Sequence, residues 1–544
     1  MSEFRNGFAE TIFKQKYAQG PDDTWAALSK RLVDDVCGTR NGTVQALFTK
    51  NELDEMEGYI RDMKFIPGGR YLYYAGRPFK AYNNCYLLRA EEDTREEWSN
   101  VTWRAMSCLM TGGGIGIDYS KLRPHGSLLK RTGGLASGPL PLMYAINEIG
   151  RNVMQGGSRR SAIYASLNWQ HADVSNFLES KNWPEETRAA KLKNFNAPAP
   201  LDMTNISVNY DDASLVGGLE NNEVFKKNVR QALETAEPGF SFNFGDKQNE
   251  TLRNACTEVT SEDDSDVCNL GSINLGNIDS IASFTRIVEL ATKFLVCGTL
   301  RADLPYDKVY QVRAKNRRLG LGLMGIHEWL LKSGSGYEVT PELHKWLGVY
   351  RDESERAGKI FCDVLGISRP VAFRAIAPTG SIGILAGTTT GIEPLFAVAY
   401  KRRFLTGGNK WKYQFVVDGT AAMLIERYGV DPNSIQSALD LSTDYERRIK
   451  FQADIQDYVD MSISSTINLA AWGSEHNNDD KVGDFTRVLA TYAPRLRGFT
   501  CYPDGSRGGQ PLTAVPYEEA MKHKDVIFEE VDICDLTGGG TCGS

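Results

Sequence analysis

An amide, a thiol and a carboxylate alternate along one short segment of this chain, at Asn254, Cys256 and Glu258. In an extended segment, residues at every second position project to one face, so we expect these side chains to line a single surface. They would offer a hydrogen-bonding amide, a redox-active sulfur and a proton acceptor to the same small molecule. This combination suits chemistry at a carbon atom that bears hydroxyl groups. An isolated pattern of this kind is nevertheless more typical of a polar edge strand with one incidental cysteine.

The length, charge and apolar content of the chain indicate which classes of protein it can belong to. The chain has 544 residues, of which 41% are hydrophobic and 24% charged, enough for three or four domains or for one large α/β barrel. Its formal net charge of −7 gives no general basic surface for nucleic acid. Residues 1–20 contain no apolar signal segment, and no run approaches the roughly 18 apolar residues of a membrane span. We therefore expect a cytoplasmic protein that binds neither nucleic acid nor membrane.

Ten cysteines in such a chain argue against a framework of disulfides, because cellular thiol pools keep structural bridges reduced. Four lie in apolar or helix-like segments, where a thiol usually behaves as a small buried hydrophobe: Cys37, Cys108, Cys297 and Cys362. The other six form no C-x-x-C pair and have no histidines at zinc-ligand spacing, so we expect no protein-bound metal. These six are Cys85, Cys256, Cys268, Cys501, Cys534 and Cys542.

The elements that must position these residues follow from apolar spacing and turn signals. Helical spacing predicts helices over residues 22–40, 51–64, 96–110, 140–154 and 283–300. Thr24 and Asn51 are the expected N-terminal caps of the first two helices. Composition predicts strands over 71–74, 82–88, 464–469 and 498–502. The stretch 267–275 fits neither period, and we interpret it as a loop with strand character.

Several loops combine glycine with cations or hydroxyl groups. The glycine run 112–116 follows a predicted helix rather than a strand, so it lacks the context of a dinucleotide-binding fingerprint. Loops 123–134 and 155–161 carry arginines, and 377–382 carries hydroxyls without a nearby acid; these features suit phosphate groups. A solvated turn is the alternative for each loop. No P-loop motif occurs.

The C-terminal segment carries Cys534 and Cys542, separated by three consecutive glycines. Glycines and a chain terminus predict mobility. A mobile dithiol can exchange with a disulfide inside a site and then be reduced again by another protein. Two idle cysteines in a disordered tail are the alternative.

Taken in order, these motifs resemble those of the catalytic subunit of ribonucleotide reductase, from about Pro67 to the C-terminus. The matching motifs are Pro67 to Arg70, Asn84-Cys85, Gly112 to Gly126, Gly157 to Arg160, Asn254 to Glu258, Cys268 to Leu275, Pro378 to Ser381 and Gly391 to Pro394. The resemblance implies a ten-stranded α/β barrel made of two five-stranded halves, with a central finger loop that carries a radical cysteine. It also implies a short helical N-terminal region (1–64), a barrel domain (65–525) and a flexible redox tail (526–544).

The resemblance implies roles for the residues that could do chemistry. As a thiyl radical, Cys256 would abstract the 3′-hydrogen of a ribonucleoside di- or triphosphate, while Glu258 takes the proton of the 3′-hydroxyl as general base. Asn254 would hold the hydroxyls. The 2′-hydroxyl would leave as water with a proton from the pair Cys85 and Cys268, which end as a disulfide. The product is a 2′-deoxyribonucleotide for DNA synthesis.

The same resemblance implies reductants and ligands. Cys534 and Cys542 would reduce the active-site disulfide and be reduced in turn by a thioredoxin- or glutaredoxin-type protein. The implied substrate-binding residues are Asn84, Pro378, Thr379, Gly380 and Ser381. A deoxynucleoside triphosphate effector, such as dTTP or dATP, would bind at loops that contain Asp118, Ser120, Arg123, Gln155, Gly157, Arg159 and Arg160. The effector could also drive formation of a homodimer. The short N-terminal region leaves no room for an ATP-cone domain.

The radical needs an external source, because no side chain here generates one unaided. In the family, this source is either a separate dimetal radical subunit, which acts through two adjacent tyrosines, or adenosylcobalamin. At the matching place this chain has Cys501-Tyr502, a single tyrosine. Tyr502 is a candidate for radical transfer or an ordinary strand aromatic. The sequence leaves the two initiators open.

Two other functions remain compatible with the residues. One is a thiol oxidoreductase that acts on a nucleotide or sugar through Cys85 and Cys268 without radical chemistry. The other is a non-catalytic, nucleotide-binding regulator with the same barrel. A requirement for Cys256 excludes the first, and turnover of any kind excludes the second.

Overall fold

The computed structural model describes residues 3–38, 48–153, 161–193, 197–406, 410–506, 512–523 and 526–529. Within these residues the largest sheet has ten strands in the order β1-β9-β2-β3-β4-β5-β6-β14-β13, with β10 paired to β9. The strands are β1 (Phe65–Pro67), β2 (Cys85–Arg89), β3 (Gly114–Asp118), β4 (Ile163–Asn168), β5 (Thr204–Asp211), β6 (Gly239–Asn243), β9 (Asp266–Asn274), β10 (Leu319–Met324), β13 (Thr466–Leu469) and β14 (Gly498–Pro503).

The sheet consists of two parallel halves. Strands β2 to β6 run parallel and are connected by helices, as parallel pairing requires. β9 pairs in parallel with β10, and β13 with β14. Antiparallel pairing of β2 with β9 and of β6 with β14 joins the halves. Parallel bridges from Leu321 to Arg374 and from Ile376 to Ile463 lead from β10 towards β13 and close the ring. The predicted α/β barrel is confirmed.

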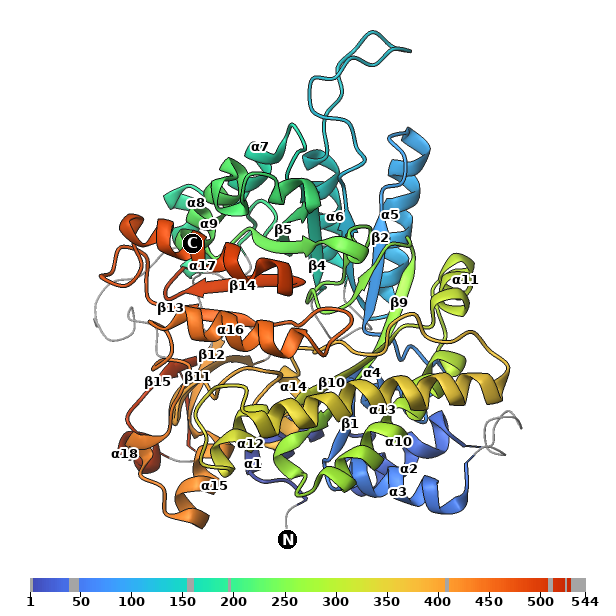
Figure 1. The fold of residues 1–544 in the computed structure, drawn as a ribbon, viewed down its shortest axis with the longest axis vertical. Helices are drawn as coiled ribbons and strands as arrows, with labels where there is room; N and C mark the ends of the chain where they lie inside the picture. Colours follow the sequence, from blue (N-terminus) through green and yellow to red (C-terminus); the bar gives the residue numbers. More distant parts are fainter. Residues whose placement is uncertain are drawn as a thin grey trace, which may run out of the picture.

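Helices cover the outside of the barrel (Figure 1). The crossover helices of the first half are α5 (Arg95–Met110), α6 (Leu140–Asn152), α7 (Val174–Glu179), α8 (Glu185–Lys193) and α9 (Glu223–Thr235). The long helices α10 (Ile281–Arg301) and α13 (Pro341–Leu365) pack on each other, and α2 (Trp25–Val36) and α3 (Lys50–Arg61) pack on α10. The remaining helices are α1 (Gly7–Lys16), α4 (Gly69–Tyr74), α11 (Asp307–Asn316), α12 (Ile326–Lys332), α14 (Gly380–Ala386), α15 (Gly419–Tyr428), α16 (Tyr445–Gln456), α17 (Asp479–Tyr492) and α18 (Tyr517–Lys522).

One of the two predicted helix caps is confirmed, and the other is wrong. Thr24 caps α2 through its side chain, as predicted. The cap of α3 is Thr49 rather than Asn51, because Thr49 and Glu52 form a reciprocal capping box. The helix therefore begins at Lys50, one residue before the predicted start.

The predictions for residues 71–74 and 267–275 differ from the structure. Residues 71–74 belong to α4 rather than to a strand, because the chain turns at Gly68, whose carbonyl accepts from the backbone N–H of Tyr71 at 2.9 Å. Residues 267–274 of the stretch 267–275 lie in β9, a continuous strand in which every residue is buried, and Leu275 begins the 3-10 helix that follows. A strand covered on both faces has no alternation of polar and apolar residues. Its periodicity therefore gave no strand signal.

A second, four-stranded sheet lies beside the barrel. Its order is β15-β11-β12-β16, formed by β11 (Ala399–Thr406), β12 (Lys410–Val417), β15 (Leu512–Ala514) and β16 (Ile527–Glu529). The expected boundary after residue 525 falls just before β16. Cys534 and Cys542 lie outside the described residues.

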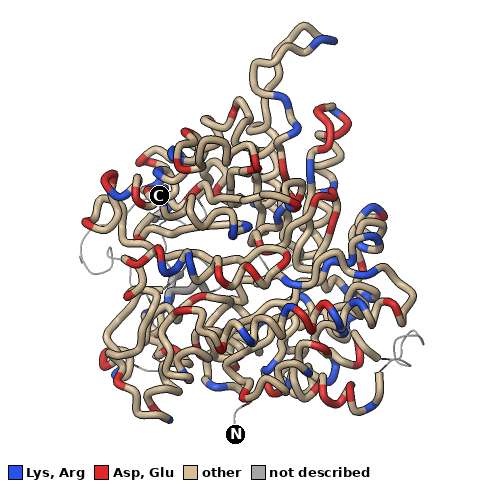
Figure 2. Tube along the Cα trace, viewed as in Figure 1, with Lys and Arg blue, Asp and Glu red and all other residues tan. Residues whose placement is uncertain are grey.

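Charges of both signs are interspersed along the chain (Figure 2), in keeping with the small net charge. Among the described helices, none has the length and apolar character needed to cross a bilayer. Cys37, Cys108, Cys297 and Cys362 are all buried, as predicted for thiols that pack as small apolar groups.

Candidate active site

The segment that carries Cys256 is the tip of a short hairpin. Its stem is formed by β7 (Leu252–Arg253) and β8 (Thr260–Ser261), which pair antiparallel. The tip is a turn rather than the expected extended segment. Thr257 has a φ of +69°, and its backbone N–H donates to the carbonyl of Asn254 at 3.0 Å.

The side chain of Asn254 explains why the tip turns. Its Oδ1 accepts from the backbone N–H of Val259 at 2.9 Å, a local bond that competes with strand pairing. The prediction that three side chains share one face was therefore wrong. Asn254 and Glu258 are each 1% exposed, whereas Cys256 is exposed. The turn sends the carboxyl and the amide inwards and leaves the thiol accessible.

Two glycines of β3 allow this hairpin to pack closely against the strand. A Cβ at Gly116 would lie 1.7 Å from the carbonyl oxygen of Arg253, and one at Gly114 would lie 3.0 Å from Cβ of Ala255. Alternate positions of a strand share a face, so both glycines clear the same surface. The glycine run of the sequence thus serves close approach of the loop, a role that the sequence analysis missed.

Cys85 and Cys268 lie opposite each other in the barrel. They form a directly paired position of the antiparallel strands β2 and β9. Directly opposed residues have Cα atoms about 4.5 to 5.5 Å apart, which is within the range that a disulfide spans. Both are buried free thiols. Two strands from distant parts of the chain thus bring together Cys85 and Cys268, the thiol pair implied by the family resemblance.

The buried polar groups of the hairpin tip meet at Cys85. Its Sγ lies 3.0 Å from Nδ2 of Asn254 and 3.8 Å from Oε1 of Glu258. Burial raises the pKa of the Cys85 thiol well above its usual value, and the neighbouring charges of Glu258, Cys268 and Cys256 add to this rise. Burial likewise raises the pKa of Cys268. Both thiols are therefore held protonated at neutral pH.

Glu258 is tuned for proton transfer. Burial raises its pKa to about 7, against opposing hydrogen bonds from Asn254, its own backbone N–H and Cys85. Within the described part of the chain, its Oε2 has no hydrogen-bond partner. A carboxylate with a pKa near the working pH and a free oxygen suits a general base.

A small apolar cluster surrounds the thiols and separates them from the main core. It contains Cys85, Leu87, Leu252, Val259, Cys268, Leu270, Ala372, Ala375, Ala377 and Met461. Leu252 and Val259 flank the hairpin tip, and Ala377 begins the predicted phosphate loop. The cluster therefore joins the thiols to the loop that we expect to hold phosphates.

In that phosphate loop, Pro378 and Gly380 are exposed, Ser381 is half-buried and Thr379 is buried. Thr379 has a φ of +49°, and its Oγ1 accepts from the backbone N–H of Gly391 at 2.8 Å. Thr379 thus holds the loop in shape, which leaves Gly380 and Ser381 accessible.

Asn84 lies beside the turn that precedes α4. Its buried Oδ1 has no hydrogen-bond partner among the described residues, and a Cβ at Gly68 would lie 3.0 Å from it. The side chain is half-buried, next to Cys85 in the sequence. It therefore lies at the edge of the same site.

The family of this chain follows from its similarity to known proteins. A sequence profile described as ribonucleotide reductase, barrel domain, matches residues 83–199, 207–344 and 368–502, which is most of the chain. The chain belongs to the ribonucleotide reductase family. It is the catalytic subunit of such a reductase, an oxidoreductase that converts ribonucleotides to deoxyribonucleotides.

Relatives and a solved structure agree with this assignment. The chain is 26% identical to a vitamin B12-dependent ribonucleoside-diphosphate reductase of Mycobacterium tuberculosis, covering 86% of this chain and 74% of the relative. An enzyme of the same name from Thermoplasma acidophilum is 26% identical, with 88% and 68% covered. The alpha subunit of the class Id ribonucleotide reductase of Actinobacillus ureae has the same fold, with a TM-score of 0.72 over 92% of this chain and 97% of that one, at 15% identity.

Tyr502 of the reductase lies on β14 and faces the same way as Thr500; both are half-buried. Its register partner on β13 is Asn468. Cys501 points to the opposite face, where its Sγ contacts the carbonyl of Ala232 at 3.6 Å, and burial raises its pKa to about 12. Cys501 is therefore a packing residue, whereas Tyr502 shares its face with polar neighbours.

The predicted effector residues divide into two groups. Asp118 is buried and accepts from the backbone N–H of Ser120 at 3.0 Å and from Oγ1 of Thr251 at 2.8 Å. Arg123 bonds through its side chain to Asp93. Asp118 is thus held inside the protein, whereas the side chain of Arg123 is 39% exposed while it is paired with Asp93. Thr251 ties Asp118 to the hairpin stem. The other four residues lie outside the described part: Gln155, Gly157, Arg159 and Arg160.

A large cavity opens beside the hairpin. It has a volume of about 1070 Å³, and its lining includes Lys181, Trp183, Trp472 and Ala162. A Cβ at Gly114 would lie 3.5 Å from Cβ of Ala162, and the same glycine supports the tip of the hairpin. One wall of the cavity therefore lies next to the segment that carries Cys256.

Proposed function

We propose that Cys256 is the radical carrier of this reductase. Its exposed thiol stands at the tip of the hairpin, while Asn254, Glu258 and Cys85 form a connected buried group directly behind it. That grouping is the observation that carries the proposal. A nucleotide that contacts Cys256 would lie next to this buried amide, base and reducing thiol.

The proposed reaction replaces the 2′-hydroxyl of the sugar with hydrogen. The thiyl radical of Cys256 takes the 3′-hydrogen of the sugar, and Glu258 takes the proton of the 3′-hydroxyl. The 2′-hydroxyl leaves as water with a proton from the thiol pair. Cys85 and Cys268 supply two electrons and become a disulfide, and their second hydrogen goes to C2′. Glu258 returns its proton to the 3′-oxygen, and Cys256 returns a hydrogen to C3′. Asn254 orients the hydroxyls.

The phosphates of the substrate would lie on Gly380 and Ser381. Exposed backbone N–H groups and a hydroxyl at the start of α14 suit phosphate oxygens. Thr379 supports this loop from below through Gly391, and Pro378 and Asn84 border the site. Ala377 places the loop within one residue of the thiol cluster.

We further propose that adenosylcobalamin is the initiator. It supplies an organic radical when it is bound. The relatives from Mycobacterium tuberculosis and Thermoplasma acidophilum are named as vitamin B12-dependent, and this chain has a lone tyrosine at Tyr502 where transfer from a partner subunit uses two. The cavity of about 1070 Å³, lined by two tryptophans, is large enough for the adenosyl group but not for the whole corrinoid. Trp183 and Trp472 would hold the adenosyl group in this cavity, one wall of which lies next to the segment that carries Cys256.

The initiator can be tested directly. With purified chain, dithiothreitol and deoxynucleotide effectors, we expect adenosylcobalamin in dim light to support conversion of CDP or CTP to its deoxy form. Formation of product is measured by chromatography. Turnover that requires a metal-loaded radical subunit from the same source instead would overturn the cobalamin proposal and leave the role of Cys256 intact.

The thiol pair gives a second prediction. Without dithiothreitol, the protein should form at most about two deoxynucleotides per chain and then stop, because Cys85 with Cys268, and the tail dithiol of Cys534 and Cys542, have each become a disulfide. Peptide mapping by mass spectrometry should show the bridge between Cys85 and Cys268 in the stopped enzyme and not before. Cys85→Ser should form less than one-hundredth of the product at the same time points. A stopped enzyme with both thiols free would contradict the assignment.

The other partners remain predictions from the family resemblance. They are the dithiol tail with Cys534 and Cys542, a thioredoxin- or glutaredoxin-type reductant, a deoxynucleoside triphosphate effector and an effector-dependent homodimer.

A further inference from the structure

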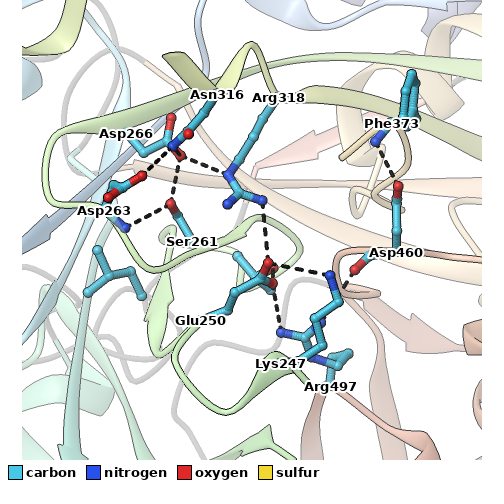
Figure 3. Close-up of polar contacts among 12 residues, drawn as sticks. Lys247, Glu250, Ser261, Asp263, Asp266, Asn316, Arg318, Phe373, Asp460 and Arg497 are labelled. Atoms are coloured by element: carbon cyan, nitrogen blue, oxygen red, sulfur yellow. Dashed lines mark hydrogen bonds and ion pairs between the residues drawn. The ribbon is translucent and has the colours of Figure 1, made fainter. Parts of the chain in front are cut away.

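The stem of the hairpin is held by a buried cluster of charges that the reaction does not use (Figure 3). Glu250 lies at its centre, two residues before β7. Its Oε2 accepts from Oγ1 of Thr260 at 2.6 Å and from Nη2 of Arg497 at 3.0 Å. Its Oε1 lies 3.7 Å from Nη1 of Arg318. One carboxylate therefore links both sides of the hairpin stem to two other parts of the chain.

The two arginines reach Glu250 from different strands of the barrel. Arg318 directly precedes β10 and also binds Oδ2 of Asp266, at the start of β9, at 2.7 Å. Arg497 directly precedes β14 and donates to the carbonyl of Asp460 at 3.3 Å. Side-chain exposures are 4% for Arg318, 10% for Arg497 and 13% for Glu250. The stem is thus clamped between two distant strands of the barrel.

The carboxylate of Glu250 is charged at neutral pH. Arg318 and Arg497 hold the pKa of Glu250 at about 2 against the opposing effect of burial. Buried ion pairs of this kind lose their compensation when one partner is removed. Neutralising Glu250 would leave two guanidiniums facing each other across the stem and would move the stem.

The stem of the hairpin is too short to fix its own position. Each side of the stem is only two residues long, and a two-stranded ribbon is marginal by itself. Arg253 adds buried bonds from its guanidinium to Oδ1 of Asn243 at 2.7 Å and to the carbonyl of Arg497 at 3.0 Å. Arg497 thus contacts the stem twice, once through Glu250 and once through Arg253.

We propose that Glu250 is a positioning residue for Cys256: its bonds to Arg318, Arg497 and Thr260 set where the hairpin tip stands in the barrel. This inference rests on the proposed role of Cys256. Catalysis is sensitive to such placement, since a shift of about 1 Å costs on the order of 100-fold in rate. The residue contacts neither substrate nor reacting atoms and acts only through the loop.

The test compares Glu250→Gln with Asp35→Asn in the full chain. Asp35 is a matched control, because it is a buried carboxylate paired with Lys80 at 2.5 Å, in α2 and outside the site. Steady-state kinetics with the nucleotide substrate are combined with alkylation by iodoacetamide, read at Cys85 and Cys256 by mass spectrometry. The alkylation readout needs no initiator.

For Glu250→Gln we expect kcat to fall at least 10-fold with KM within 2-fold of the parent, and alkylation of the buried Cys85 to quicken at least 10-fold. Asp35→Asn should change neither quantity beyond 2-fold. Unchanged kcat and unchanged alkylation in folded Glu250→Gln would overturn the proposal, as would equal effects in Asp35→Asn.

Two further variants keep the test informative if Glu250→Gln does not fold. Glu250→Asp keeps the charge on a shorter side chain, and Thr260→Val removes only the bond across the stem; each should lower kcat 3- to 10-fold. Parental kinetics in both would overturn the proposal. Failure of the radical assignment is separate, because it would appear as an active Cys256→Ser variant whatever Glu250 does.

Discussion

Cys256→Ser is expected to abolish nucleotide reduction, with a loss of at least about 10⁴-fold in kcat that brings it to the background of the assay. A serine hydroxyl cannot replace the thiol as radical carrier, because its O–H bond is much stronger than S–H. The side chain is exposed at a turn, so the fold and nucleotide binding should persist. Product formation, circular dichroism and equilibrium binding of the nucleotide measure the three quantities.

Cys501→Ser is the control for that substitution. Its thiol lies on the far face of β14 and contacts the carbonyl of Ala232, a contact that a serine hydroxyl can make. Turnover should stay within about 2-fold of the parent. Residual turnover by Cys256→Ser above background would favour the non-radical oxidoreductase, which depends on Cys85 and Cys268 alone.

Glu258→Gln should slow turnover by about 10²- to 10⁴-fold, the usual contribution of a general base. Because burial raises the pKa of Glu258 to about 7, the parent should lose kcat/KM as the pH falls below about 7. The variant should lack this acidic limb. A parent profile that is flat between pH 6 and 8 would contradict the role of Glu258 as base.

The same substitution should stabilise the fold at alkaline pH. The pKa of Glu258 rises from 4.5 in the unfolded chain to about 7 in the fold, so the folded state binds more protons than the unfolded state between these values. Stability of the parent therefore falls as the pH rises through this window, by about 3 kcal/mol in total. A neutral glutamine avoids that cost. Denaturant unfolding should show the variant to be more stable at pH 8, with the difference vanishing near pH 4.

The sequence predicted the reactive residues better than the structure that positions them. The ordered set of motifs from Pro67 to Pro394, which includes Asn254, Cys256 and Glu258, pointed to the correct family, and strand-like composition around Cys85 was enough to expect a strand there. The shape of the hairpin tip was not predictable, because it depends on Asn254 bonding to Val259 rather than on alternation. The alternation of Asn254, Cys256 and Glu258 along the sequence favours an extended segment, whereas the structure has a turn.

The framework around the hairpin depends on contacts between distant residues. Glu250 reads as one acid in a polar turn, and only the fold brings Arg318 and Arg497 to it. Burial on both faces likewise removed the alternation that would have identified β9. Local patterns carry no information about such partners, so the sequence alone could not nominate the clamp.

The glycines of β3 that contact the hairpin limit which substitutions can stabilise this protein. Exchange of glycine for alanine inside strands is a common way to gain stability, because it reduces the freedom of the unfolded chain. At Gly116 the new methyl group would collide with the backbone of Arg253, 1.7 Å away. The collision involves main-chain atoms, which have no alternative rotamer to retreat to. Protein engineering should therefore leave Gly116 unchanged, as it would leave the reactive thiols, because the position works through the space that it leaves free for the backbone of Arg253.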